Sequence, residues 1–285
     1  MKKMFITLLF LCAAYAILPV HTLQAQDAKD SIAFLSARWN WKKLDKGAEA
    51  GSARMQLFGS TQTISIIKYP ARKFRTQIIH SPGECAGTTD SLAMKHGASI
   101  AVNGSYFNMK TLFPHTFLSY KHRIVGRTEG DEIVRSDGIL AFKGKKGRTM
   151  YIFPCDSSSY EDYREKYYCA IASGPLLIQD GKTQAFQDNK FNSTRHPRSI
   201  IGYDSHGYCY FIVIDGRFPG MGDGATIPEA AAVARYLGLE SAINMDGGGS
   251  STLWSENTGV INHPSDNGKF DHRGCRTVAN IVIAK

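Results

Sequence analysis

Short β-strand patterns recur along most of this chain and outnumber helical patterns by about three to one. The strand patterns are rich in Ile, Val, Phe and Tyr and are bounded by Gly, Pro, Asp or Asn; they fall at 63–67, 77–80, 99–102, 139–142, 149–153, 199–203, 208–214, 242–245 and 278–284. Helices are predicted at 88–96, 228–237 and, more weakly, 159–167. Because strands and helices do not alternate regularly, the pattern favours an α+β fold with a mixed β-sheet core and few helices over a doubly wound fold.

The composition is that of a globular protein with a sizeable core. Of 285 residues, 43% are apolar and 21% are charged, which excludes disorder along most of the length. No long Pro/Ser/Gly tract or charge block divides the chain, so we expect a single domain. A formal net charge of +9 indicates anionic partners such as phosphates or acidic glycans. Nucleic acid is a poor candidate because the basic residues are scattered.

The first 25 residues have the pattern of a secretory signal peptide. Lys2 and Lys3 precede an apolar run over 4–20, and small residues follow up to Ala25. The run is short for a membrane span, and no later stretch approaches 18 uninterrupted apolar residues. We therefore expect a secreted or periplasmic protein without a membrane anchor. Lipid attachment at Cys12 is disfavoured because the bulky Leu11 precedes it.

The predicted mature chain has an N-terminal extension and one main domain. Residues 26–60 are polar, with no regular pattern around Trp39 and Trp41, and we interpret them as an extension packed on the domain of residues 61–285.

Cysteine usage fits an oxidising compartment only in part. Cleavage after Ala25 leaves an odd number of cysteines: Cys85, Cys155, Cys169, Cys209 and Cys275. At least one must therefore stay unpaired within a monomer. No CxxC motif is present, which disfavours a zinc site. Cys155 and Cys169 flank a polar segment and are the best candidates for a disulfide.

The most informative loop is 244–252, with the sequence NMDGGGSST. The strand pattern 242–245 delivers Asn244 and Asp246; three glycines follow, which permit positive φ and close approach of the backbone to a ligand. Ser250, Ser251 and Thr252 then add hydroxyl groups. The loop lacks the lysine of a Walker motif, and it continues as strand, unlike a dinucleotide fingerprint. A polar or anionic ligand fits this loop, and so does a glycine-rich hairpin with surface hydroxyls.

Four other segments place polar residues beside strand patterns. Asp215 and Arg217 follow a buried strand at its carboxyl end, where ligand clefts in open sheets commonly lie. A lone Asp-Gly-Arg is more often a turn with a solvated arginine. The remaining segments are weaker: NGSYF with Asn103 and Tyr106, SGPLLI with Ser173 and Gly174, and HPRSIIG with Arg198.

Taken together and in this order, NGSYF, SGPLLI, HPRSIIG, IDGR followed by GATIPEAA, NMDGGGSST and RTVANIV resemble the phosphodiester glycosidase family. The resemblance covers roughly residues 60–285. Two departures stand out: Ser105 replaces the more usual glycine of NGGYF, and Cys275 and Thr277 flank Arg276 where an acid and a proline are common.

The resemblance implies hydrolysis of the C1–O bond of a sugar 1-phosphodiester, with an N-acetylglucosamine-type sugar on a glycan or wall-associated substrate. Its transition state resembles an oxocarbenium ion, so a carboxylate should face C1 and cations should surround the departing phosphate. Asp246, Asp215 and Arg217 are the candidate catalytic residues. The candidate substrate-binding residues are Asn103, Tyr106, Ser173, Gly174, Arg198, Asn244, Gly247, Gly248, Gly249, Ser250, Ser251, Thr252, Arg276 and Asn280.

Three alternatives stay open at this point. The first is a phosphodiesterase that splits the P–O bond on the same scaffold. The second is a metal-assisted hydrolase in which Asp215 and Asp246 hold a divalent cation such as calcium, because two aspartates without histidines favour a hard cation. The third is a non-catalytic glycan-binding module, against which the pairing of carboxylates with arginines argues. The glycosidase interpretation itself requires no cofactor. The sequence does not determine the oligomeric state.

Overall fold

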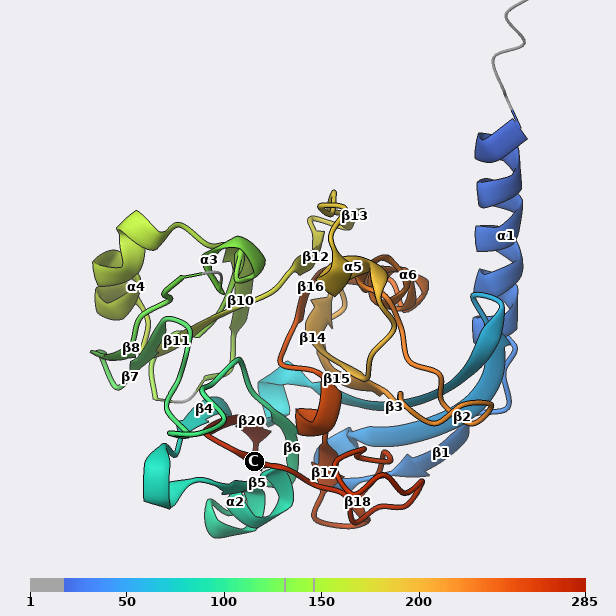
Figure 1. Cartoon of the computed structure of the whole chain (residues 1–285). Helices are drawn as coiled ribbons and strands as arrows, with labels where there is room; N and C mark the ends of the chain where they lie inside the picture. Colours follow the sequence, from blue (N-terminus) through green and yellow to red (C-terminus); the bar gives the residue numbers. More distant parts are fainter. Residues whose placement is uncertain (1–17, 131, 146) are drawn as a thin grey trace, which may run out of the picture.

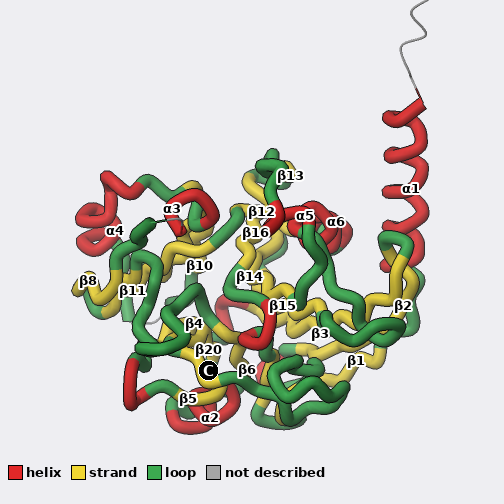
Figure 2. The backbone as a smooth tube through the Cα atoms, in the orientation of Figure 1, coloured by secondary structure: helices red, strands yellow, loops and turns green. Residues whose placement is uncertain are grey.

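The computed structural model describes residues 18–130, 132–145 and 147–285. Its largest sheet has eight strands, all paired antiparallel to their neighbours (Figures 1 and 2). In spatial order they are β1 (Asn40–Lys43), β2 (Glu49–Leu57), β3 (Ser60–Pro70), β15 (Tyr208–Ile214), β14 (Arg198–Asp204), β16 (Leu239–Asn244), β12 (Leu176–Gln179) and β13 (Lys182–Thr183). The edges of this sheet are therefore β1 and the two-residue β13.

Two five-stranded antiparallel sheets and one strand pair complete the β-structure of the described residues. One sheet has the order β10 (Met150–Pro154), β9 (Gly138–Phe142), β11 (Cys169–Ser173), β7 (Leu118–Tyr120), β8 (Arg123–Gly126). The other has the order β18 (Gly259–Val260), β17 (Leu253–Ser255), β6 (Ile100–Asn103), β20 (Asn280–Ala284), β4 (Thr76–His80). The short strands β19 (Thr277–Val278) and β5 (Gly87–Thr88) form the remaining pair.

Helices are few and mostly short, which confirms the α+β expectation. They are α1 (Leu18–Leu35), α2 (Thr89–Lys95), α3 (Glu132–Arg135), α4 (Tyr160–Lys166), α5 (Lys190–Ser193) and α6 (Ile227–Tyr236). The helices predicted from the sequence correspond to α2, α4 and α6. In α6, Thr226 and Glu229 form a reciprocal capping box, and Pro228 stands in the first turn, so the sequence itself fixes where this helix begins. Within the described part of the chain, every helix is too short or too polar to span a bilayer.

The inner strands of the eight-stranded sheet are buried on both faces. Along β15, Cys209, Phe211 and Val213 pack into the core shared with the two smaller sheets. The alternating residues Tyr210 and Ile212 pack into a second core with α6. This double burial explains the unbroken apolar run in β15 and gives a rigid frame for the loops at the strand ends.

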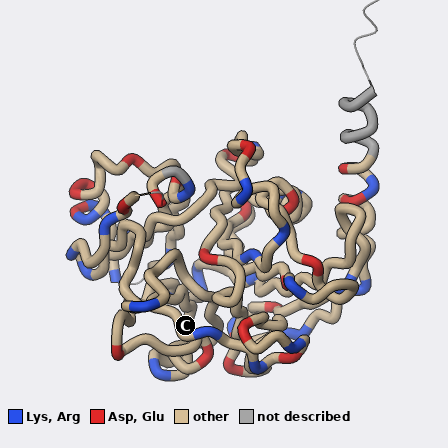
Figure 3. The backbone as a smooth tube through the Cα atoms, in the orientation of Figure 1, with Lys and Arg blue, Asp and Glu red and all other residues tan. Residues whose placement is uncertain are grey.

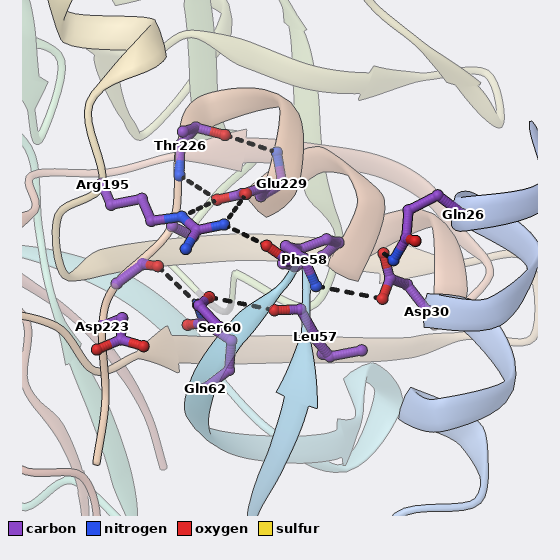
Figure 4. Close-up of polar contacts among 12 residues, drawn as sticks. Gln26, Asp30, Leu57, Phe58, Ser60, Gln62, Arg195, Asp223, Thr226 and Glu229 are labelled. Atoms are coloured by element: carbon purple, nitrogen blue, oxygen red, sulfur yellow. Dashed lines mark hydrogen bonds and ion pairs between the residues drawn. The ribbon is translucent and has the colours of Figure 1, made fainter. Parts of the chain in front are cut away.

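The expectation that residues 26–60 are irregular was wrong. Strand β2 pairs with β3 from Glu49 to Leu57, so this segment belongs to the main sheet. The last turns of α1 dock beside it: Asp30 Oδ1 accepts a hydrogen bond from the backbone nitrogen of Phe58 at 3.2 Å (Figure 4). Most of the predicted signal peptide, residues 1–17, lies outside the described residues.

The predicted Cys155–Cys169 disulfide is absent, because both thiols are free. Cys169 points into the inner core beside Ile171, whereas Cys155 packs on the other side of the same sheet with Tyr160. Their positions on opposite faces prevent a bond without movement of the backbone. Cys85, Cys209 and Cys275 are free as well.

Candidate active site

Strand register brings the separated sequence motifs to one edge of the large sheet. Strand β14 runs antiparallel to both β15 and β16, so Arg198 lies opposite Ile214 and Ile200 lies opposite Asn244. The loops after β15 and β16 therefore leave the sheet beside the segment that enters β14. A second sheet meets this edge, because the Asp246 backbone nitrogen donates to the Gly104 carbonyl at 3.0 Å, just after β6.

Asp246 has an unusual electrostatic environment for a carboxylate. The residue is partly exposed. Burial of its carboxyl group raises the pKa to about 6, and the nearby Ser250 hydroxyl, Arg276 and Arg135 oppose that shift. A carboxyl group that titrates near neutral pH beside two guanidinium groups is suited both to stabilise a cation and to exchange a proton.

Two arginines flank the glycine loop that follows Asp246. Gly248 has a φ of 61°, and a Cβ placed there would lie 2.8 Å from Arg217 Nη2. A Cβ on Gly249 would collide with the Arg276 guanidinium. The glycines are therefore required for both arginines to approach the loop. Gly248 also donates its backbone N–H to the Pro197 carbonyl at 2.9 Å, which fixes the loop against the segment before β14.

Arg217 itself adopts a backbone conformation that is uncommon for a residue with a side chain. Its φ is 71°, in the left-handed region. The adjacent Gly216 packs tightly on Pro197, where a Cβ would lie 2.5 Å from the proline nitrogen. This local strain is held by the surrounding loops and directs the guanidinium toward Gly248. Such strained residues cluster at functional sites.

The three candidate asparagines, Asn103, Asn244 and Asn280, form buried hydrogen bonds within the protein. Asn103 Nδ2 donates to the Asp246 carbonyl, and Asn103 Oδ1 accepts from Ser199 Oγ at 2.7 Å. Asn280 Oδ1 accepts from the Ser105 backbone nitrogen at 2.7 Å. All three side chains are buried. The sequence suggested that they bind substrate, whereas in the structure their side chains are used in buried bonds to the protein.

Tyr106 and Gly174 form part of the same scaffold. The Tyr106 hydroxyl donates to the Gly174 carbonyl, which also accepts from Asn244 Nδ2 at 2.7 Å. Burial raises the pKa of the Tyr106 phenol, and the nearby Asp246 charge adds to that effect. The phenol therefore stays protonated and serves as a fixed hydrogen-bond donor.

The hydroxyl groups near the loop are less accessible than expected. Ser173, Ser250, Ser251 and Thr252 are buried, and their side-chain oxygens are shielded from solvent. The backbone of Gly247 and Gly248 is the more exposed part of the loop. In this conformation the Gly248 N–H is bonded to Pro197, and Arg276 is paired with the Asp266 carboxylate. Arg217, whose guanidinium forms no ion pair with a described residue, is therefore better placed than the hydroxyls to meet an anion.

Arg198 is directed into the protein. Its guanidinium donates to the carbonyls of Ala225, Phe191 and Thr194 at 2.8–2.9 Å, and the residue is 1% exposed. Burial lowers its pKa to about 10. Its donors are committed to shaping the loop before β14, which corrects the expectation from the sequence.

Asp215 was expected to be catalytic, but its carboxylate is directed into the protein. The side chain is fully buried, and Oδ1 accepts from the backbone nitrogen of His263 at 3.0 Å and from Asn262 Nδ2 at 3.1 Å. Oδ2 accepts from His263 Nδ1 at 2.8 Å. With N–H donors on both oxygens, this arrangement does not fit a cation held between Asp215 and Asp246. Among the described residues, no three His, Cys, Asp or Glu side chains gather as a metal-binding group.

Sequence reasoning missed Arg135, which lies near Asp246, and two residues of the segment before β14. The guanidinium of Arg135 lies 4.7 Å from the centre of the Tyr106 ring and forms an ion pair with Glu132. His196 lies close enough to Arg198 and Arg217 that their charges, after burial, lower its pKa. Arg195, next to His196, is fixed by the Glu229 carboxylate and donates to the Phe58 carbonyl (Figure 4). The segments EIVRSDG and RHPRSIIG carry these residues without a motif that separates them from solvated charges.

Comparison with known proteins identifies the family of this chain. Residues 96–285 match the sequence profile of the phosphodiester glycosidases. The chain belongs to the phosphodiester glycosidase family. A bovine relative named N-acetylglucosamine-1-phosphodiester alpha-N-acetylglucosaminidase is 24% identical over 233 residues, which are 75% of this chain and 42% of the relative. A mouse relative of the same name is 24% identical over 229 residues, which are 75% of this chain and 43% of the relative. The chain thus spans less than half the length of the curated relatives that it matches.

Two solved structures share the fold of this chain. The catalytic domain of the zebrafish N-acetylglucosamine-1-phosphodiester alpha-N-acetylglucosaminidase, auto-inhibited by its pro-peptide, aligns with a TM-score of 0.65 and 15% identity over 86% of this chain and 87% of that chain. A hypothetical protein from Synechocystis aligns with a TM-score of 0.63 and 13% identity over 86% of this chain and 63% of that chain. The family assignment rests on the profile match over residues 96–285, and these two structures show that the fold is shared.

Proposed function

We propose that this chain is an exported hydrolase that cleaves the C1–O bond of sugar 1-phosphodiesters. The names of the bovine and zebrafish relatives favour N-acetylglucosamine as the sugar. One observation carries the proposal: a carboxyl group with a pKa raised to about 6, Asp246, stands at the start of a glycine loop flanked by Arg217 and Arg276.

The chemistry of the leaving group fits this arrangement. A phosphate monoester leaves as a stable anion, with a second pKa of about 6, so no strong general acid is needed to expel it. Arg217 and Arg276 would hold the phosphate oxygens, and arginine suits this task because its planar donors contact two oxygens at once. Their charge stabilises the developing negative charge as the C1–O bond breaks.

Asp246 would act on the sugar side of the scissile bond. Its carboxylate faces the positive charge that develops at C1 in the oxocarbenium-like transition state. Water then supplies the new oxygen at C1 and loses a proton, and the phosphate leaves on the aglycone. The Asp246 carbonyl is fixed by Asn103 Nδ2 at 2.7 Å, so the carboxylate is positioned by a rigid frame.

The position of the cleaved bond can be tested with labelled water. The purified protein is incubated in ¹⁸O water with an N-acetylglucosamine 1-phosphodiester, and both products are analysed by mass spectrometry. Label in the released sugar supports cleavage at C1–O. Label in the phosphate would establish a phosphodiesterase, and no turnover across a panel of sugar diesters would favour a non-catalytic glycan-binding module.

A further inference from the structure

A second cleft lies at the opposite end of β14 and β15 from the candidate active site. It is about 700 Å³ and is bounded by the end of β3 near Pro70, by the β14–β15 turn around His206, and by the start of β10. Strand β15 has seven residues and, at about 3.3 Å per residue, separates the two sites by about 20 Å. The volume is within the range of clefts that hold small organic ligands.

The inner wall of this cleft is largely apolar. Met150 and Cys209 are buried and belong to the inner core, and Ala71 and Tyr203 pack against that core. Because this wall joins strands from two different sheets, it is a preformed surface of the fold. Such a wall favours the apolar body of a ligand.

The rim of the cleft is cationic. Arg72 and Arg148 both line the cleft and are exposed. Neither forms an ion pair with any described residue. Both guanidinium groups are therefore available to an anion.

The one acidic residue of the lining does not neutralise this rim. Asp204 is 8% exposed, and its Oδ1 accepts from the backbone nitrogens of His206 and Tyr208, each at 2.9 Å. Its Oδ2 accepts from the Tyr210 hydroxyl at 2.8 Å. The carboxylate is thus held in the β14–β15 turn by neutral donors and forms no ion pair with Arg72 or Arg148, so the two arginines outnumber the one acid of the lining.

We propose that this cleft is a second binding site, for an amphipathic organic anion. The apolar body of the ligand packs on Met150 and Tyr203, and its phosphate or carboxylate group meets Arg72 and Arg148. This proposal rests on the cleft alone and does not depend on the reaction at Asp246.

Methionine methyl groups provide a reporter at each site. Met150 lies in the wall of the cleft, and Met245 directly precedes Asp246. The full-length protein is labelled with ¹³C-methyl methionine, and Met150→Leu assigns the cleft signal. Hexyl phosphate is the probe. Hexanol, which has only the apolar chain, and inorganic phosphate, which has only the anionic group, are the controls. We expect saturable movement of the Met150 signal, with hexyl phosphate at least tenfold tighter than either half.

Charge variants test the role of the rim. Arg72→Ser combined with Arg148→Ser should weaken hexyl phosphate binding at Met150 at least tenfold. Lys73→Ser combined with Lys145→Ser removes the same charge from neighbouring exposed positions outside the cleft lining and should leave binding unchanged.

Each contrary result has a distinct meaning. A Met150 signal that does not move, equal binding of hexanol or phosphate, or equal weakening by the lysine pair overturns the proposal. A Met245 signal that does not move when a sugar phosphodiester is added counts against the proposed reaction. The binding of hexyl phosphate measured at Met150 does not depend on that result.

Discussion

Asn103 and Asp246 are 143 residues apart in sequence, yet Asn103 Nδ2 donates to the Asp246 carbonyl at 2.7 Å. The bond joins the end of β6 in one sheet to the loop after β16 in another. Asn103 is fully buried and also binds the Ser199 hydroxyl and the Thr252 backbone nitrogen. The position of the Asp246 backbone is therefore set by contacts from three separate strands or loops, before any substrate is present.

Asp246→Asn should abolish turnover while the protein still folds. The substitution keeps the shape of the side chain but removes the charge that faces the oxocarbenium ion. In the parent protein, kcat/KM should fall as pH drops through about 6, because the Asp246 carboxylate becomes protonated. Rate measurements from pH 4 to 9 check this, with the exposed Asp162→Asn as a matched control. A flat profile would contradict the assignment.

The same variant should change stability in a pH-dependent way. The pKa of Asp246 is raised in the folded state, so ionisation is unfavourable there, and the cost is complete above pH 6 and absent below about pH 4. Asp246→Asn should therefore stabilise the protein by about 1–2 kcal/mol at pH 8, once partial solvent exposure is considered. At pH 3.5 the two proteins should unfold alike. Urea denaturation at both pH values measures the difference.

Arg217→Lys should lower kcat by about 10²-fold, because an ammonium group cannot reproduce the two-pronged contact with phosphate. The backbone of residue 217 is strained in the parent and stays so in the variant, so folding should change little. Steady-state kinetics with a sugar 1-phosphodiester measure the loss. Arg123→Lys, at an exposed position, is the control. Equal rates for both variants would exclude Arg217 from the phosphate site.

Arg135→Met should move the acidic limb of the pH profile upward. Arg135 is one of the cations that lower the pKa of Asp246, so its removal lets burial raise that pKa further. A comparison of pH–rate profiles for the two proteins tests this. A limb that stays in place while only the maximal rate falls would show that Arg135 acts on the substrate alone.

Asp215 and His263 should behave as one structural unit. Replacing Asp215 by Asn leaves His263 without its buried partner, and His263→Gln leaves a buried carboxylate poorly compensated. We expect a coupling free energy of about 1–3 kcal/mol in a double-mutant cycle of unfolding. Unlike Asp246→Asn, Asp215→Asn should retain measurable turnover. If the stability losses are additive and Asp215→Asn is completely inactive, Asp215 acts in the reaction and not as a structural partner of His263.

The sequence predicted well where strands end, but it predicted poorly whether the polar side chains at those ends face solvent or the protein interior. Asp246, Arg217 and Arg276 belong to motifs at strand or turn boundaries, and the antiparallel register brings these motifs to one edge. Arg198 and Asp215 occur in motifs of the same kind, yet their side chains turn inward. That difference depends on carbonyls and on His263 from distant segments, which no local pattern encodes. Strand β2 was missed because its small and polar residues, such as Ala50 and Ser52, lack the β-branched pattern used to recognise strands.

Export should leave a chain that begins near residue 26. The expected cleavage after Ala25 would preserve Asp27 and Asp30, which bind Tyr236 and the Phe58 backbone, so the processed chain should keep its docked N-terminal segment. Intact mass after native export checks the start of the chain. A mass that includes residues 1–25, or lipid on Cys12, would contradict the signal peptide.

The two edge strands of the eight-stranded sheet have features that disfavour pairing with a strand of another chain. An exposed edge is a template for another chain, and long, flat, apolar edges promote aggregation. Here β1 is only four residues long and carries Lys42 and Lys43. Strand β13 has two residues, of which Lys182 is one; lysines are blue in Figure 3. Charge and brevity thus discourage the addition of another chain's strand at either end of this sheet.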